Sequence, residues 1–199
     1  MESSVLPLYE ARGRVRAAFP KVEAEKAKDV EGVSVTVSVD EGEVFNFGEV
    51  RVAVEGLPQP ELQKAAAFKT DGIANLSEIE AGIDRVRQRL RRTGFLKPDF
   101  RVERTLHVDK KTLDLVVHVD QGHQFRFGKL IVTGLELNGE AEIRRRWAMK
   151  PGAPFDAGYP DFFVARITED GLFDNLRKAK SAIKLNDQSH TADVTLQFR

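Results

Sequence analysis

The sequence predicts an α+β protein built from repeated β-α-α-β-β modules, and three observations lead to this prediction. Residues 40–52 recur as residues 120–132, 80 positions later. Before each copy, apolar residues alternate with mostly polar ones, a period-two pattern typical of a half-buried strand. Between the copies, Ile79, Ile83, Val86 and Leu90 follow a helical spacing of four, three and four, which indicates an amphipathic helix.

The repeated stretch shares a motif of Asp, Glu or Gln, Gly, two variable positions, then Phe-x-Phe-Gly and alternating apolar residues. Its phenylalanines are Phe45 and Phe47 in the first copy and Phe125 and Phe127 in the second. A phenylalanine ring has no polar group to keep in water, so these four rings are predicted to lie in cores. The glycine after the acidic pair permits a tight turn.

The order of elements follows from these patterns. In the middle of the chain we expect a strand over 47–54, helices over 60–68 and 76–93, and strands over 100–108 and 112–119. The order repeats with a strand over 126–132, a helix over 141–147, a helix around 162–167, and strands over 179–185 and 192–198. Helical sequence also runs into Gly13 and Gly94, which are expected helix stops.

This order divides the chain into three modules. Residues 43–121 and 122–199 each form one complete module, whereas residues 1–42 form a partial module that contains only a C-terminal half. The strands of the partial module are expected over 14–22 and 33–39. Because the partial module lacks one strand and one helix, its half-core is predicted to be exposed.

Composition excludes several classes of function. The 31 basic and 31 acidic residues balance, which argues against nucleic-acid binding by the whole chain. The sequence has no cysteine, so disulfides and thiolate metal sites are excluded. No apolar run approaches the length of a membrane helix, and no signal peptide opens the chain. If the protein is exported, we therefore expect this to be a mature or excised fragment.

A search for catalytic chemistry gives no candidate. None of the four histidines stands at a zinc-ligand spacing, and neither a Gly-x-Ser-x-Gly elbow nor a phosphate-binding loop occurs. The acidic cluster at Asp40, Glu41 and Glu43 lacks a calcium-loop pattern. We therefore predict a protein that is not an enzyme, with no catalytic residue, no metal and no cofactor.

The helix ending in glycine, the strand pair, the acidic turn and the Phe-x-Phe-Gly motif together resemble tandem POTRA domains. These polypeptide-transport-associated modules occur in outer-membrane surface-antigen proteins of the BamA and TamA type. The resemblance implies a three-stranded mixed sheet with two helices on one face of each module. It also implies a periplasmic location, as the soluble part of an outer-membrane protein. The implied role is a protein-binding scaffold that assists outer-membrane β-barrel assembly or translocation.

The resemblance further implies how partners bind. Unfolded outer-membrane or secreted polypeptides would add a strand to a sheet edge, and accessory assembly proteins would dock on the same scaffold. The implied edge is the first strand of the closing hairpin, most clearly in the middle module. Its partner-binding residues are Phe100, Arg101, Val102, Glu103, Arg104 and Leu106. The alternative interpretation is an edge whose charges protect it from aggregation.

Two arginine clusters form a second candidate surface. They contain Arg85, Arg89 and Arg92 on a predicted helix, and Arg144 and Arg145 near a second one. One interpretation is contact with anionic lipid headgroups at the membrane surface or with an acidic partner. The other is a solvated helix face.

Two alternative functions stay open beside the assembly scaffold. One is a POTRA-like module of a two-partner secretion or cell-division protein. The other is a nucleic-acid-binding α/β module that uses the arginine-rich helix. The leading hypothesis includes no nucleic-acid partner.

Overall fold

The computed structural model describes residues 3–27, 31–171 and 178–199. It separates into two compact units. The first unit contains residues 1–86 and 100–119, and the second contains residues 87–99 and 120–199. In the described residues, no helix has both the length and the apolar character that a membrane crossing requires.

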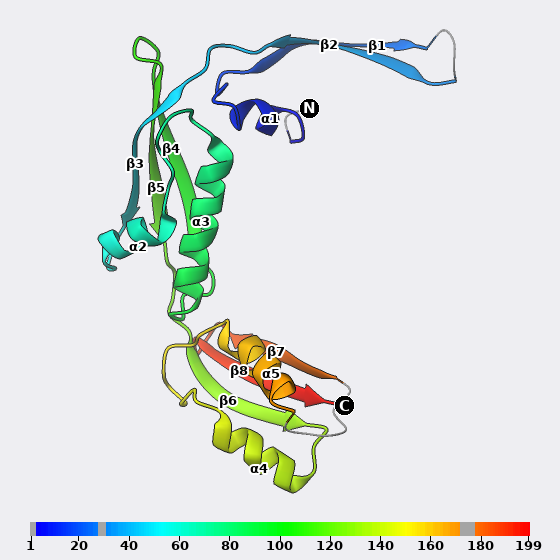
Figure 1. Cartoon of the computed structure of the whole chain (residues 1–199), viewed down its shortest axis with the longest axis vertical. Helices are drawn as coiled ribbons and strands as arrows, with labels where there is room; N and C mark the ends of the chain where they lie inside the picture. Colours follow the sequence, from blue (N-terminus) through cyan, green and yellow to red (C-terminus); the bar gives the residue numbers. More distant parts are fainter. Residues whose placement is uncertain (1–2, 28–30, 172–177) are drawn as a thin grey trace. The chain divides into compact units, whose positions relative to one another are not determined.

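The first unit holds a three-stranded mixed sheet in the order β3-β5-β4. Strand β3 (Asn46–Val54) runs parallel to the central strand β5 (Thr112–Asp120), and β4 (Asp99–His107) joins β5 through a tight turn. Helices α2 (Gln59–Ala66) and α3 (Leu76–Arg91) accompany this sheet (Figure 1). This order is the predicted β-α-α-β-β succession.

The core of the first unit follows the predicted periodicities. Ile79, Ile83 and Val86 lie on the buried side of α3. Strand β5 buries every second residue on the same side, because successive side chains of a strand point to opposite faces. The predicted core rings Phe45 and Phe47 are 0% and 8% exposed. The Asn75 side chain accepts a hydrogen bond from the Ser77 N–H and so caps the start of α3.

The second unit repeats the arrangement with a sheet in the order β6-β8-β7. Its strands are β6 (Arg126–Thr133), β7 (Ala179–Asn186) and β8 (Thr191–Phe198), and its helices are α4 (Leu137–Arg146) and α5 (Tyr159–Glu169). Strand β8 lies in the centre, parallel to β6 and antiparallel to β7. The core includes Phe125, Phe127, Ile143, Phe155, Phe163, Ile167, Ala192, Val194, Leu196 and Phe198.

Two glycines that end helical segments also close long-range contacts. Gly13 and Gly94 have φ angles of 74° and 94°, which L-residues with side chains rarely adopt. Their carbonyl oxygens accept hydrogen bonds from the backbone N–H groups of Phe45 and Phe125, at 2.9 and 2.7 Å. A Cβ at Gly94 would lie 2.6 Å from the Phe125 carbonyl oxygen, so this close approach requires glycine.

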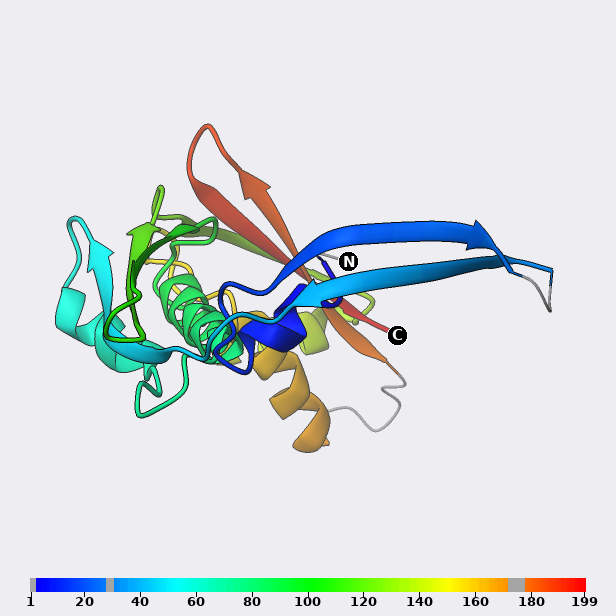
Figure 2. The same cartoon turned by 90° about the horizontal axis from the view of Figure 1, so that it is seen from above.

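The N-terminal segment contains α1 (Leu6–Glu10) and a two-stranded sheet of β1 (Ala18–Lys26) and β2 (Val33–Asp40). Figure 2 shows this hairpin in blue. On β2, Val33 and Val35 are 67% and 58% exposed, whereas the alternate residues of β5 and β8 are buried.

Two predicted elements are misplaced. The first strand covers 18–26 rather than 14–22, because residues 14–17 form a turn in which the Ala17 N–H bonds the Arg14 carbonyl. Pro20 then falls at the irregularity in the β1–β2 register, where a missing N–H disrupts no ladder bond. Helix α4 begins at Leu137 rather than 141, since Leu137, Asn138 and Gly139 break the apolar spacing used for the prediction without ending the helix.

Candidate functional site: the strand edges

Each three-stranded sheet has one central strand and two edges. The edges are β3 and β4 in the first unit and β6 and β7 in the second. The outward N–H and C=O groups of an edge strand have no partner in the sheet, so another extended chain can pair with them. The candidate site is therefore a property of the backbone, and its character depends on which side chains cover each edge.

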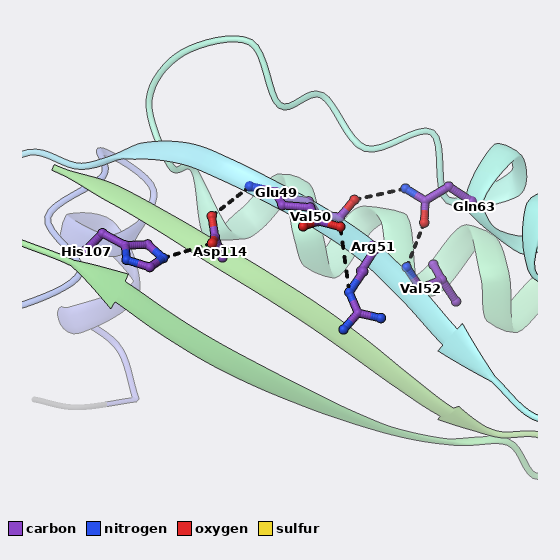
Figure 3. Close-up of polar contacts among 7 residues, drawn as sticks. All are labelled: Glu49, Val50, Arg51, Val52, Gln63, His107 and Asp114. Atoms are coloured by element: carbon purple, nitrogen blue, oxygen red, sulfur yellow. Dashed lines mark hydrogen bonds and ion pairs between the residues drawn. The ribbon is translucent and has the colours of Figure 1, made fainter. Parts of the chain in front are cut away.

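The edge at β3 is covered by a glutamine (Figure 3). Gln63, on α2, accepts a hydrogen bond from the Val52 N–H at 2.6 Å and donates one to the Val50 carbonyl at 3.0 Å. A side-chain amide carries one acceptor and two donors, so it can satisfy both groups as a neighbouring strand would. Gln63 therefore occupies the position that an added strand would need.

At the corresponding edge of the second unit, an arginine covers β6. Arg144 Nη1, on α4, donates to the Leu130 carbonyl at 3.0 Å. A guanidinium has no acceptor atom, so Arg144 cannot also bond a strand N–H as Gln63 does. The β6 edge is therefore covered by a donor alone.

The predicted partner-binding residues all lie on the edge strand β4. Phe100, Val102 and Leu106 are half-buried, whereas Arg101, Glu103 and Arg104 are exposed. Two of the charged residues contact other elements of the first unit. Glu103 lies 3.0 Å from His118 of β5, and Arg104 lies 2.8 Å from Glu10 of α1. One charged side chain of this edge is thus held toward α1.

Sequence reasoning missed a carboxylate that shapes the parallel pair of strands. Asp114 of β5 accepts a hydrogen bond from the Glu49 N–H at 2.7 Å and lies 2.9 Å from His107 Nε2 (Figure 3). The β3–β5 register shifts between Phe47 and Val50, so Asp114 supplies the acceptor that the ladder lacks there. The Glu49 N–H, followed by the His107 side chain, holds the pKa of Asp114 below its usual 3.8.

The second unit contains the same arrangement. Asp193 of β8 accepts a hydrogen bond from the Lys129 N–H at 3.1 Å, where the β6–β8 register shifts. A Cβ at Gly48 or Gly128 would collide with the neighbouring aspartate, which explains the glycine of the Phe-x-Phe-Gly motif. The sequence signal was present, because Thr-x-Asp occurs at both 112–114 and 191–193.

The predicted basic residues lie on separate elements, and several have intramolecular partners. Arg85 and Arg89 belong to α3, Arg92 follows it, and Arg144 and Arg145 belong to α4. Arg85 donates to the carbonyls of Ala66 and Ala67 at 2.8 and 3.2 Å, where α2 ends. This side chain therefore caps a helix as well as carrying charge.

On α4, acidic residues compensate the arginines. Arg144 contacts Glu140 at 2.7 Å, and Arg145 donates two hydrogen bonds to Glu142, each 2.8 Å long. Hydrogen bonds from Arg145 and Arg146 lower the pKa of Glu142 to about 2. Part of this predicted cationic surface is thus engaged within its own helix. Across the described ranges, no three His, Asp or Glu side chains are placed to hold a metal ion.

Comparison with known proteins agrees with this architecture. The POTRA family, described as surface antigen variable number repeat, matches residues 46–122. The outer membrane protein assembly factor BamA of Neisseria meningitidis is 22% identical over 177 residues, which is 87% of this chain and 22% of that protein. A putative outer membrane protein assembly factor of Treponema pallidum is 26% identical over 202 residues, covering 92% of this chain and 23% of the relative.

Solved structures show the same fold. The crystal structure of Haemophilus influenzae BamA POTRA3-5 has a TM-score of 0.68 at 18% identity, covering 99% of this chain and 78% of that one. BamA from Haemophilus ducreyi lacking POTRA domains 1-3 has a TM-score of 0.63 at 15% identity, covering 78% and 29%.

These findings define the fold of the chain. Residues 46–122 match the POTRA family, and the chain shares the fold of the POTRA domains of BamA. The chain spans about a fifth of the length of the curated relatives it matches.

Proposed function

We propose that this chain is a non-catalytic, periplasmic scaffold that binds polypeptides during outer-membrane β-barrel assembly or translocation. Extended segments of unfolded outer-membrane or secreted proteins add to the β4 edge along Phe100, Arg101, Val102, Glu103, Arg104 and Leu106. Accessory assembly proteins dock on the same scaffold. The names of the relatives support the assembly role, and the POTRA fold supports a place beside an outer-membrane barrel.

The observation that carries the proposal is the asymmetry between the two edges of the first unit. Gln63 satisfies the outward groups of Val50 and Val52, so an incoming strand at β3 must displace it. Strand β4 lies at the opposite edge of the sheet. Gln63 covers β3 alone, so adding a strand at β4 does not require displacing it.

The side chains of β4 also suit pairing with a strand in which apolar and polar residues alternate. Phe100 and Val102 are half-buried on one face, and Arg101 and Glu103 are exposed on the other. A neighbouring strand places its own side chains on the same two faces, where apolar and opposite-charge cross-strand pairs are favourable. Amphipathic strands of β-barrel precursors have this alternation.

Amide NMR of the whole chain tests the proposal. Titration with an extended amphipathic peptide should shift the amide signals of residues 100–106. The matched control is the same peptide with every backbone nitrogen methylated, which keeps its side chains but removes the donors of both edges. We expect this control to lose binding. Shifts confined to α3, or equal binding of both peptides, would show that strand addition at β4 is wrong.

The nucleic-acid alternative makes a different prediction. It requires arginines of α3 to contact phosphates, and affinity should then fall steeply with salt. Arg85 already bonds the carbonyls that end α2, which leaves it less available for this role. The secretion alternative shares the fold and the edge, so the two differ only in the polypeptide that binds.

A further inference from the structure

The sheet of the second unit has one face without helices, and β8 shows which residues line it. Ala192, Val194, Leu196 and Phe198 are buried in the core on the side of α4 and α5 (Figure 1). Because side chains alternate along a strand, Asp193, Thr195, Gln197 and Arg199 point to the opposite face. This uncovered face is the subject of the inference.

Cationic residues of β6 and β7, together with residues just before β7 and just after β8, gather on the uncovered face. On β7, Lys180 pairs with Gln197 and Lys184 with Asp193, and cross-strand partners share a face. Lys178 and Arg199 exchange two backbone hydrogen bonds, at 2.9 and 2.8 Å, and so extend the same ladder. From β6, Lys129 Nζ lies 3.8 Å from Asp193. The basic face is therefore Lys129, Lys178, Lys180, Lys184 and Arg199, with Asp193 as its carboxylate.

Part of the basic face surrounds a shallow hollow of about 130 Å³. Lys178, Lys180, Gln197 and Arg199 line it. Within the described ranges, Lys178, Lys180, Lys184 and Arg199 form no ion pair, and Asp193 is already engaged by Lys129. The uncompensated charges are exposed, so their electrostatic field reaches solvent.

The corresponding face of the first unit differs in charge, although its fold is the same. There, acidic side chains lie beside basic ones, in the pairs Glu49 with Arg51, Glu103 with His118 and Asp114 with His107. The POTRA fold therefore does not itself require a basic sheet face. Lysines can protect an edge strand from aggregation, which would explain Lys180 and Lys184 on β7. It does not explain Arg199, which follows the central strand β8.

We propose that the basic face docks on a membrane surface of anionic phospholipids. The charge is complementary, and a helix-free sheet face lets several lysines approach a layer of phosphates together. Lysine ammonium groups are mobile point charges that suit such a layer better than a fixed bidentate partner. The lining of the hollow offers no aromatic or aliphatic anchor for a peptide side chain. This surface is distinct from the β4 edge of the proposed function.

Vesicle flotation of the whole chain tests the proposal. The probes are vesicles of phosphatidylcholine alone and vesicles in which about a third of the lipid is phosphatidylglycerol. Each basic residue near an anionic membrane contributes roughly a fivefold factor in partitioning. We expect the wild-type chain to float only with the anionic vesicles, and the double variant Lys178→Ala/Lys180→Ala to lose about tenfold or more of this binding.

The control variant Arg51→Ala/Lys64→Ala removes two cations from the first unit and should bind like wild type. All four lysine and arginine side chains are exposed, so circular dichroism should show unchanged folding. Equal flotation with both vesicle types, or equal losses in the two double variants, would overturn the proposal. So would displacement from the vesicles by an equal charge concentration of soluble polyglutamate or inorganic phosphate, because the site would then prefer a free anion.

Discussion

At the scale of single residues, one carboxylate in each compact unit replaces a missing backbone acceptor. Asp114 and Asp193 bond the N–H groups of Glu49 and Lys129, where the parallel strands fall out of register. Each N–H bonds the Oδ1 atom of its carboxylate, and hydrogen bonds to an ionised acceptor are stronger than those to a neutral one. In the first unit, the side chain of His107 also contacts the carboxylate of Asp114. In the second unit, Asp193 instead forms an ion pair with the side chain of Lys129.

Replacing this carboxylate should weaken the first unit in a pH-dependent way. The folded pKa of Asp114 lies below its usual 3.8, so its contribution is fully present above that value. The contribution disappears as the pH falls through the folded pKa. We expect Asp114→Asn to lower the urea midpoint at neutral pH. The difference from wild type should shrink on acidification towards pH ~2.

Urea unfolding of both proteins across this pH range is the measurement. Asp40→Asn is a suitable control, because Asp40 bonds a turn N–H at Gly42 but does not bridge two strands. A difference that stays constant down to the lowest pH would contradict the assigned role of Asp114.

At the scale of elements, α2 limits where a strand can be added. Its Gln63 covers the β3 edge with two hydrogen bonds, whereas Arg144 of α4 makes a single bond to β6. A helix that packs on a sheet can thus also cover an edge strand of that sheet with one of its side chains. This arrangement reduces the number of edges that are free to pair, which is one way in which proteins control unwanted strand association.

Removing the glutamine should open the second edge. Gln63→Ala leaves the outward groups of Val50 and Val52 without the side-chain amide, at an expected cost of about 1–3 kcal/mol in unfolding free energy. Titration with the amphipathic peptide should then shift the amide signals of both residues. Gln63→Glu, which keeps an acceptor for the Val52 N–H but loses the donor, should show a smaller effect. Unchanged peptide shifts in Gln63→Ala would mean that β3 is closed by something else.

The elements themselves were largely predictable, because their signals are local. Alternation along β5 and β8 and the helical spacing of Ile79, Ile83 and Val86 gave the correct element types. The first strand was misplaced because its start depends on a turn at Arg14, which leaves no mark in apolar spacing.

The contacts that define the edges were not predictable from one sequence. Asp114 and Glu49 are 65 residues apart, and Gln63 acts on a strand 11 to 13 residues before it. In the sequence alone, such a polar residue cannot be distinguished from an ordinary surface residue, because its partner comes close only when the sheet has formed. The edge residues on β4 could be predicted because the pattern that indicates a strand lies within a short stretch of sequence. Their role in binding stays a prediction.

At the scale of the whole molecule, the chain divides into two compact units. The second has a contiguous core around Ile143, Phe155 and Leu196, all fully buried. The first buries Phe45, Val52 and Val117 to the same extent. Because apolar burial is the main stabilising contribution, each unit has its own source of stability.

Core truncations should therefore act within one unit. Ile143→Ala is expected to cost about 2–5 kcal/mol and to speed amide exchange in residues 120–199. Val52→Ala, its counterpart in the first unit, should speed exchange in residues 46–86 and 100–119. Hydrogen exchange followed by mass spectrometry distinguishes the two patterns. Uniform acceleration over the whole chain by either variant would show that the units unfold as one.

The β1–β2 hairpin has a practical consequence for handling the protein. Its second strand presents Val33, Val35 and Val39 to solvent, at 67%, 58% and 41% exposure, and its sheet has no third strand. Water-facing valines beside unsatisfied peptide groups form a template on which another copy can stack. We therefore expect concentrated samples to form fibrous aggregates through this hairpin. Charged substitutions at these valines should prevent this aggregation.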